Sequence, residues 1–274
     1  MRSSRLVTAL RYGLATALAL LFLLPFYVIV RNAFSTNQNI NAPRWSWLPD
    51  QLNLANLDSM LSSDSTGVLR GLLNSAIMTI LQTVGTVVVS LMAGYGLARF
   101  THRLSRMVLG LTVFTLMVPT TTTFIPMFII TSQFGWIDSF RGLVIPGMFS
   151  AFATYLFRQA FLDFPSELED AALMDGCNPF TAFWRIVVPN STGTVAAVGT
   201  IVLIGSWNAF LWPSLVGREA TRTVQVALSQ YMTSQNVRYP ELFVGSLIAI
   251  LPMLVVFLFL QRFLVQGLAT SGLR

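Results

Sequence analysis

Long apolar runs alternate along the chain with short segments that hold most of its charged residues. A helix needs about 20 largely apolar residues to cross the hydrocarbon core of a bilayer, so runs without Asp, Glu, Lys or Arg indicate candidate spans. Six spans are predicted: Tyr12–Val30, Leu72–Ala98, Met107–Thr131, Gly142–Phe157, Thr192–Leu215 and Leu242–Leu260. The pattern therefore predicts an all-α integral membrane protein with one transmembrane domain over residues 1–274.

The first apolar run has the basic flank of a secretory signal peptide, because Arg2, Arg5 and Arg11 precede it. It differs from such a peptide in length and ending. The run continues to Val30, and no small-x-small cleavage pattern follows a short apolar core. We interpret it as an uncleaved anchor.

Composition also favours a membrane protein over a soluble domain. Apolar residues fill 54% of the positions and charged residues only 10%, against about 25% charged in a soluble domain. The net charge of +6 favours contact with anionic lipid over nucleic acid, because no basic stripe with interleaved aromatic residues is present. The single cysteine, Cys177, excludes an internal disulfide framework.

The arginines, which supply all 17 basic residues, predict the orientation. With the N-terminus in the cytoplasm, ten arginines fall on the cytoplasmic side and seven outside. The side richer in basic residues is normally the cytoplasmic one. Both termini are then cytoplasmic. So is the loop 163–190, called the acidic loop below, which carries five of the eleven acids.

Prolines interrupt the third predicted span. Pro119 and Pro126 flank four threonines at 120–123. A proline frees a backbone carbonyl, which must find another partner inside a bilayer. Two interpretations remain open: a packed kink whose carbonyls are satisfied by threonine hydroxyls, or polar backbone that lines a solute path, with Thr122 as a candidate contact.

A membrane-embedded enzyme would need reactive groups converging at one depth. The only histidine, His102, lies among arginines in a short loop, and Cys177 has no histidine near it in sequence. No span has an ionisable residue near its centre, which argues against a proton relay or ion coupling. No phosphate-cradling glycine loop is present. We expect no catalytic residue, no metal site and no cofactor in this chain, so ATP-driven work would need a partner subunit that binds ATP and Mg.

The acidic loop has the local signals of a helical hairpin, and residues 167–189 read ELEDAALMDGCNPFTAFWRIVVP. Ser166 followed by Glu169 fits a capping box that would begin a helix after Pro165. Gly176 suits the left-handed stop of that helix, because it has no β-carbon. A short first helix with a sharp glycine turn is therefore predicted.

A second helix is predicted directly after the turn, with Asn178 as its N-cap and Pro179 as its first residue. We expect Pro189 to end this helix. Its apolar stripe consists of Phe180, Phe183, Trp184 and Val187.

The outer surface of the hairpin decides what it could bind. Leu168, Ala171 and Ala172 share one face of the first helix, and the two alanines make it flat. The hairpin could lie against lipid headgroups, but its acids would then face anionic lipid. Docking into a groove of a protein partner accounts for the acids, the flat face and the turn together.

The hairpin resembles the EAA loop of ATP-binding-cassette (ABC) importer permeases, whose pattern is Glu-Ala-Ala, three residues, Gly, nine residues, Ile-x-Leu-Pro. The matching positions are Asp170, Ala171, Ala172, Gly176, Ile186 and Pro189. Asp170 replaces the glutamate of the family, and Val188 replaces its leucine.

Other segments resemble the carbohydrate-uptake subgroup, in particular the second permease of the maltose-importer type. They read NSAIMTILQTVGTVVVSLMAGYGLARF, PTTTTFIPMFIITSQFGWIDSFRGLVIP, SWNAFLWP and QRFLVQGLATSGLR. The family usually ends with Gly-Ala-x-Lys, whereas this chain ends with Ser-Gly-Leu-Arg.

The resemblance implies a type I importer permease fold with six transmembrane helices in a prokaryotic cell membrane. It also implies pairing with a homologous second permease as a heterodimer, two cytoplasmic ATPases that bind ATP and Mg, and an extracytoplasmic solute-binding lipoprotein. The residues expected to couple this chain to the ATPases are Glu167, Glu169, Asp170, Ala171, Ala172, Asp175, Gly176, Ile186 and Pro189.

Trp207, Asn208 and Trp212 join Thr122 as candidates for the solute path, because neutral sugars are held by aromatic faces and hydrogen-bonding groups. Each could instead be an interfacial anchor or a packing residue. Three alternatives to a sugar importer remain: an importer of another solute, a membrane-embedded enzyme, and an anchor or assembly protein, which would not need proline-broken spans. The sequence does not name the solute.

Overall fold

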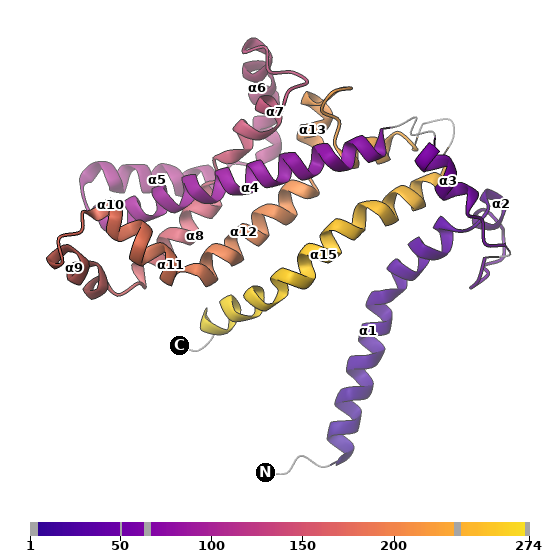
Figure 1. The fold of residues 1–274 in the computed structure, drawn as a ribbon, viewed down its shortest axis with the longest axis horizontal. Coiled ribbons are helices and arrows are strands. Elements are labelled where there is room, and N and C mark those ends of the chain that lie inside the picture. The colour runs from indigo at the N-terminus through magenta and orange to yellow at the C-terminus, as the bar shows by residue number, and fades with distance from the viewer. Residues whose placement is uncertain (1–4, 50, 63–66, 233–236, 272–274) are drawn as a thin grey trace. The chain divides into compact units, whose positions relative to one another are not determined.

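The computed structural model describes residues 5–49, 51–62, 67–232 and 237–271. Helices and loops make up these ranges, which contain no β-strand beyond an isolated bridge between Met232 and Val237. The elements, labelled in Figure 1, are α1 (Arg5–Ala33), α2 (Asn37–Ile40), α3 (Ala55–Ser62), α4 (Val68–Arg99), α5 (Arg103–Met117), α6 (Thr120–Gln133), α7 (Phe140–Val144), η1 (Ile145–Met148), α8 (Ala151–Leu162), α9 (Ser166–Met174), α10 (Pro179–Ala182), η2 (Phe183–Val187), α11 (Val188–Asn190), α12 (Thr192–Trp207), α13 (Leu211–Val216), α14 (Val224–Ser229) and α15 (Tyr239–Ser271). Arg2 and the final residues 272–274, used above for the orientation and the tail, lie outside the described residues.

Three of the described helices are long and apolar enough to cross a membrane: Val7–Ala33, Val68–Arg99 and Tyr239–Phe259. Three further pairs of helices pass the same test only together, because each pair is bent at a short break. The described chain therefore contains three candidate spans, or up to six if each bent pair counts as one.

The predicted span Met107–Thr131 is not one continuous helix in the structure. It is divided between α5 and α6, which meet at 106°. The cause is local: Pro119 restricts the residue before it to extended backbone, and Val118 has φ −83° and ψ 120°. Threonine hydroxyls bond carbonyls on both sides of this break, as the packed interpretation expects, but the bend is too sharp for a kink.

The fourth and fifth predicted spans also contain breaks. Phe140–Met148 and Ala151–Leu162 are inclined at 42°. The fifth predicted span, Thr192–Leu215, is divided between two helices, because α12 ends at Trp207 and α13 begins at Leu211. Pro213 lies in the first turns of α13, where its missing N–H costs no helical hydrogen bond.

Two compact units divide the chain. One comprises Met1–Leu69 and Ala227–Pro252, and the other Arg70–Val226 and Met253–Arg274. Arg31 orders the loop after α1 in the first unit. Its side chain is buried, donates to Asn39 and to the hydroxyl of Ser46 (2.6 Å), and lies 4.9 Å from the ring centroid of Trp45.

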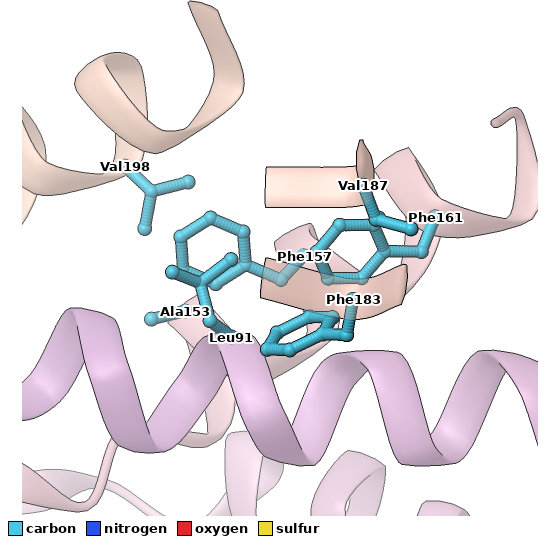
Figure 2. Packing of buried hydrophobic residues seen from close by; sticks show 7 residues of the cluster. All are labelled: Leu91, Ala153, Phe157, Phe161, Phe183, Val187 and Val198. Carbon is cyan, nitrogen blue, oxygen red and sulfur yellow. The ribbon is translucent and has the colours of Figure 1, made fainter. Parts of the chain in front are cut away.

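The second unit contains an aromatic core that fixes the position of the acidic loop. Its buried members are Leu91, Ala153, Phe157, Phe161, Phe183, Val187 and Val198. Figure 2 shows the three phenylalanine side chains gathered beside the helix that carries Leu91. Gly94 allows α4 to approach α8 closely, because a β-carbon there would lie 2.9 Å from the backbone nitrogen of Arg158. The end of α4, α8 and the acidic loop therefore share one core.

Polar side chains on α4 hydrogen-bond the carbonyl of Gly147, which lies next to the break between η1 and α8. Gln82 and Thr86 each donate to the carbonyl of Gly147 at 3.3 Å. Gln82 also accepts from the hydroxyl of Ser206 on α12 at 3.0 Å. Such pairing is required inside a bilayer, where water does not replace lost backbone hydrogen bonds.

Candidate functional site

The acidic loop begins with α9, directly after Pro165 as predicted. The predicted capping box is wrong, because no side chain caps this helix. Glu169, which would have turned back toward the helix start, points to α4 instead. A charge-assisted contact with a distant arginine has replaced the local hydrogen bond.

Glu169 is clasped by two residues of α4. The Nε of Arg99 lies 3.0 and 3.1 Å from its two carboxylate oxygens, and a second guanidinium nitrogen forms a salt bridge to it. The hydroxyl of Tyr95 donates to the same carboxylate at 2.7 Å. Glu169 is only 8% exposed. Breaking a pair of this kind leaves a buried charge without a partner, so the clasp holds α9 against the end of α4.

The turn after α9 is a Schellman motif. The amide of Cys177 donates to the carbonyl of Ala172 and the amide of Gly176 to that of Leu173, both at 3.0 Å. Gly176 has φ +84°, in the left-handed region that only glycine adopts freely. The predicted glycine stop is confirmed.

The second helix begins as predicted and ends differently. Asn178 caps it by accepting from the amide of Thr181 at 2.8 Å, and Pro179 is its first residue. The helix does not stop at Pro189 but continues to Asn190 through a π-helical turn. Proline has no N–H to give, and the chain widens before it, so that the amide of Val188 donates to the carbonyl of Phe183 five residues earlier.

The predicted apolar stripe of the second helix is divided between the core and the surface. Phe183 and Val187 are buried, Trp184 is half-buried and Phe180 is 64% exposed. The ring centroid of Phe183 lies 4.6 Å from that of Tyr95. One edge of the stripe therefore anchors the second helix in the core, and the other remains outside.

The first helix has an exposed apolar surface flanked by acids. Its exposed apolar residues are Leu168, Ala171, Leu173 and Met174, and its exposed acids are Glu167, Asp170 and Asp175. Met174, at 87%, is more exposed than Leu168 or Leu173. Ala172 was predicted to lie on the flat outer face, but it is only 4% exposed and therefore lies on the buried side of the helix. The hairpin thus has a fixed inner side and an open outer side.

Comparison with known families identifies this arrangement. A family model described as binding-protein-dependent transport system inner membrane component matches residues 85–270, a range that includes the whole acidic loop. The chain belongs to this family of transport permeases.

Curated relatives of the permease share about a third of its residues. The sn-glycerol-3-phosphate transport system permease protein UgpE of Yersinia pestis bv. Antiqua (strain Antiqua) is 33% identical over 260 residues, 92% of each chain. The arabinooligosaccharides transport system permease protein AraQ of Bacillus subtilis (strain 168) is 35% identical over 202 residues, 73% of this chain and 72% of that protein. The lactose transport system permease protein LacG of Rhizobium radiobacter is 36% identical over 199 residues, 72% of this chain and 73% of that protein.

A solved structure shares the fold of the permease. It is a crystal structure of a bacterial ABC transporter involved in the import of the acidic polysaccharide alginate. One of its chains matches with a TM-score of 0.79, covering 96% of this chain and 98% of that chain. The identity is 21%, so this likeness shows the fold alone. The predicted type I ABC importer permease fold is confirmed.

The residues predicted to couple the permease lie on both sides of the hairpin. Glu169 and Ala172 face inward, and Gly176 forms the turn. Ile186 is half-buried and Pro189 exposed. Sequence reasoning missed Arg99 and Tyr95. Their four-residue spacing at the end of an apolar run places them on one helix face, but nothing local points to a glutamate 70 residues later.

The candidates for the solute path lie in different surroundings. Trp207 and Trp212 are buried, and the indole N–H of Trp212 donates to the carbonyl of Gly142 at 3.1 Å. Asn208 and Thr122 are exposed, and each donates to a carbonyl of its own helix or helix cap. Among the described residues, no group of three or more His, Cys, Asp or Glu could hold a metal ion.

Proposed function

We propose that this permease is a subunit of an ATP-driven, binding-protein-dependent importer of a sugar or sugar-derived solute. The solute class rests on the relatives, which are named for arabinooligosaccharides, lactose and sn-glycerol 3-phosphate. The coupling role rests on one observation: an apolar surface flanked by acids stands on a hairpin whose inner side is clasped to a long apolar helix.

The complete importer contains four further components. A homologous second permease pairs with this chain as a heterodimer, two ATPases bind ATP and Mg at the cytoplasmic face, and a lipoprotein receptor delivers the solute from outside. The arginine distribution supports an orientation with both termini and the acidic loop in the cytoplasm. The host is a prokaryotic cell, and the membrane is its cytoplasmic membrane.

In this proposal α9 sits in a groove of one ATPase and acts as the coupling helix. Leu168, Ala171 and Met174 enter the groove, while Glu167, Asp170 and Asp175 meet basic groups at its rim. Glu169 and Ala172 hold the helix from inside, and Gly176 sets the angle of the hairpin. Ile186 and Pro189 shape the second arm, which leads through α11 into α12.

A rigid hairpin is what such coupling requires. The ATPases must favour one membrane conformation by several kcal/mol to shift its population. The clasp between α4 and α9 and the shared aromatic core can carry that bias, because closure of the ATPases then moves α4, α8 and α12 together with the hairpin.

A polyol phosphate is a second candidate for the solute. The relative named for sn-glycerol 3-phosphate matches 92% of the chain, more than the two relatives named for sugars. No candidate residue of the solute path in this chain is cationic, so a phosphate would have to be bound by the receptor or by the other permease.

Reconstitution tests the proposal. The permease pair, the ATPases and the receptor are placed in proteoliposomes, and uptake of labelled arabinotriose, lactose and glycerol 3-phosphate is measured with ATP or a non-hydrolysable analogue inside. We expect ATP-dependent uptake of at least one of the three. Failure of the ATPases to co-purify with the permease would refute the coupling role, and ATP-dependent uptake of none of the three would refute the solute class.

Gly176→Pro tests the role of the hairpin, and Gly193→Ala is its control. Gly176→Pro should insert into the membrane normally but lose uptake, because proline cannot adopt a φ of +84°. Gly193→Ala, in open space within α12, should retain uptake. Equal uptake by both variants would contradict the proposed role of the hairpin.

A further inference from the structure

A second ordered region lies between α13 and α14, in the loop Gly217–Arg222. Three successive residues of this loop, Arg218, Glu219 and Ala220, are exposed. Exposed loops of this length usually have few fixed contacts. This one is hydrogen-bonded to two side chains that are distant in sequence, Asp138 and Asn74, and both lie within the same compact unit as the loop.

Asp138 holds the amides of the loop. One of its carboxylate oxygens accepts from the amides of Arg218 (2.9 Å) and Thr221 (3.0 Å) and from the hydroxyl of Thr221 (2.8 Å). Its other oxygen accepts from the amide of Ala220 at 3.1 Å. Four neutral donors therefore surround a single carboxylate.

Asn74 of α4 holds the carbonyls of the same loop. Its side-chain amide donates to the carbonyls of Ala220 at 3.2 Å and Arg222 at 2.9 Å. Asn74 is 5% exposed, and the adjacent Ser75 accepts from the amide of Val224 at 2.9 Å. Asp138 thus holds the hydrogen-bond donors of the loop, and Asn74 holds its carbonyl acceptors.

The backbone of Asp138 is itself in an unusual conformation. Its φ is 54°, and among the described residues no other non-glycine residue has a positive φ. Its amide donates to the carbonyl of Val216 at 2.8 Å, at the end of α13. Residues persist in this region when their surroundings determine them strongly. Asp138 and Asn74, called the clamp below, therefore fix both the carboxylate and the loop around it.

We propose that Asp138 and Asn74 are positioning residues that preform the Gly217–Arg222 loop as a contact surface for the solute-binding protein. This inference rests on the proposed function and its orientation, which place the loop on the outer face. A preformed loop loses little conformational entropy on binding. Adjacent charges of opposite sign, on Arg218 and Glu219, suit the polar rim of a transient interface.

Titration of the reconstituted importer with its receptor tests the proposal. ATP hydrolysis is measured in nanodiscs against the concentration of receptor loaded with arabinotriose, lactose or glycerol 3-phosphate, whichever stimulates the wild type most. In Asp138→Asn and Asn74→Ala we expect the half-saturating receptor concentration to rise about three- to tenfold with the maximal rate unchanged. Gln133→Ala, at the exposed end of α6, should match the wild type.

Two surface variants keep the test decisive if a clamp variant fails to assemble. Arg218→Ala and Glu219→Ala leave the hydrogen bonds of the clamp in place, because none of these bonds involves the side chain of Arg218 or Glu219. Both variants should raise the same half-saturating concentration. A fall in maximal rate with unchanged half-saturation in the clamp variants would overturn the proposal, as would wild-type half-saturation in both surface variants. An absence of stimulation in the wild type would instead refute the proposed function.

Discussion

Arg99 at the end of α4 and Glu169 in α9 form a salt bridge across 70 positions of sequence. Their side chains are 22% and 10% exposed, so the pair is largely screened from water. Tyr95, one turn before Arg99, adds a third contact to the carboxylate. A long apolar helix and the proposed coupling helix are therefore joined by charge, while the aromatic core joins α4 to the second helix of the hairpin through Phe183 and Val187.

Removing one partner of this pair should uncouple the permease. Arg99→Ala leaves the buried carboxylate of Glu169 with Tyr95 alone, and we expect a loss of about 2 to 4 kcal/mol in local stability, discounted for the partial exposure of the arginine. Uptake should fall more than membrane insertion. The measurement is solute uptake per inserted permease, with ATPase activity recorded in parallel.

The double variant Arg99→Ala with Glu169→Gln tests whether the two residues act through their interaction with each other or independently. Neutralising the orphaned carboxylate should restore part of the lost uptake, because the two changes are not additive when residues are in contact. Strictly additive losses would show that the two residues act independently.

Met174→Lys should weaken ATPase docking without unfolding the permease. The side chain is 87% exposed and would be buried only in the partner's groove. We expect reduced co-purification of the ATPases and an unchanged melting temperature of the isolated permease. Leu104→Lys, which is 65% exposed in α5, is the control. Equal co-purification in the two variants would contradict docking through α9.

Gly176→Ala measures the cost of the left-handed turn alone. A β-carbon at this position would meet nothing within 4 Å, so the penalty comes only from φ +84°. We expect a destabilisation of about 1 to 2 kcal/mol, read as a lower melting temperature in detergent. Gly193→Ala is the matched control, because its surroundings are equally open. A melting temperature unchanged in Gly176→Ala would contradict the strained turn.

Acid should loosen the Gly217–Arg222 loop. Burial would raise the pKa of Asp138, but the amides of Arg218, Ala220 and Thr221 and the hydroxyl of Thr221 together lower it below its usual value. The stabilisation is then fully present above the unfolded pKa and is lost as pH falls through the lower folded pKa. The melting temperatures of the wild type and Asp138→Asn should differ near pH 7 and converge below about pH 3.9. A gap that persists at low pH would contradict this account.

Local signals predicted the hairpin turn well. The stop at Gly176 and the start at Asn178–Pro179 depend only on backbone conformation and on hydrogen bonds within four or five residues. The same local reasoning failed for Glu169, because a capping box and an ion pair compete for one carboxylate. The carboxylate pairs with Arg99, which lies on another helix and is not part of any local pattern.

The breaks in the predicted spans were harder to place. Pro119 marks its break in the sequence, but the 106° angle depends on packing that no local pattern encodes. The break after Trp207 precedes the nearest proline, Pro213, by several residues. Runs without charged residues predicted which segments could lie in a membrane. Tertiary contacts decided where the helices bend.

Cross-linking at the tip of α9 tests the central claim most directly. Cys177→Ser removes the only native thiol, and Met174→Cys then places a single reactive thiol at a position of α9 that is 87% exposed. In membrane vesicles of the assembled importer, we predict that this thiol reacts only with reagents that reach the cytoplasmic side and cross-links to an ATPase subunit. Labelling from the outer side, or an assembled complex in which it cross-links to no ATPase, would contradict the account.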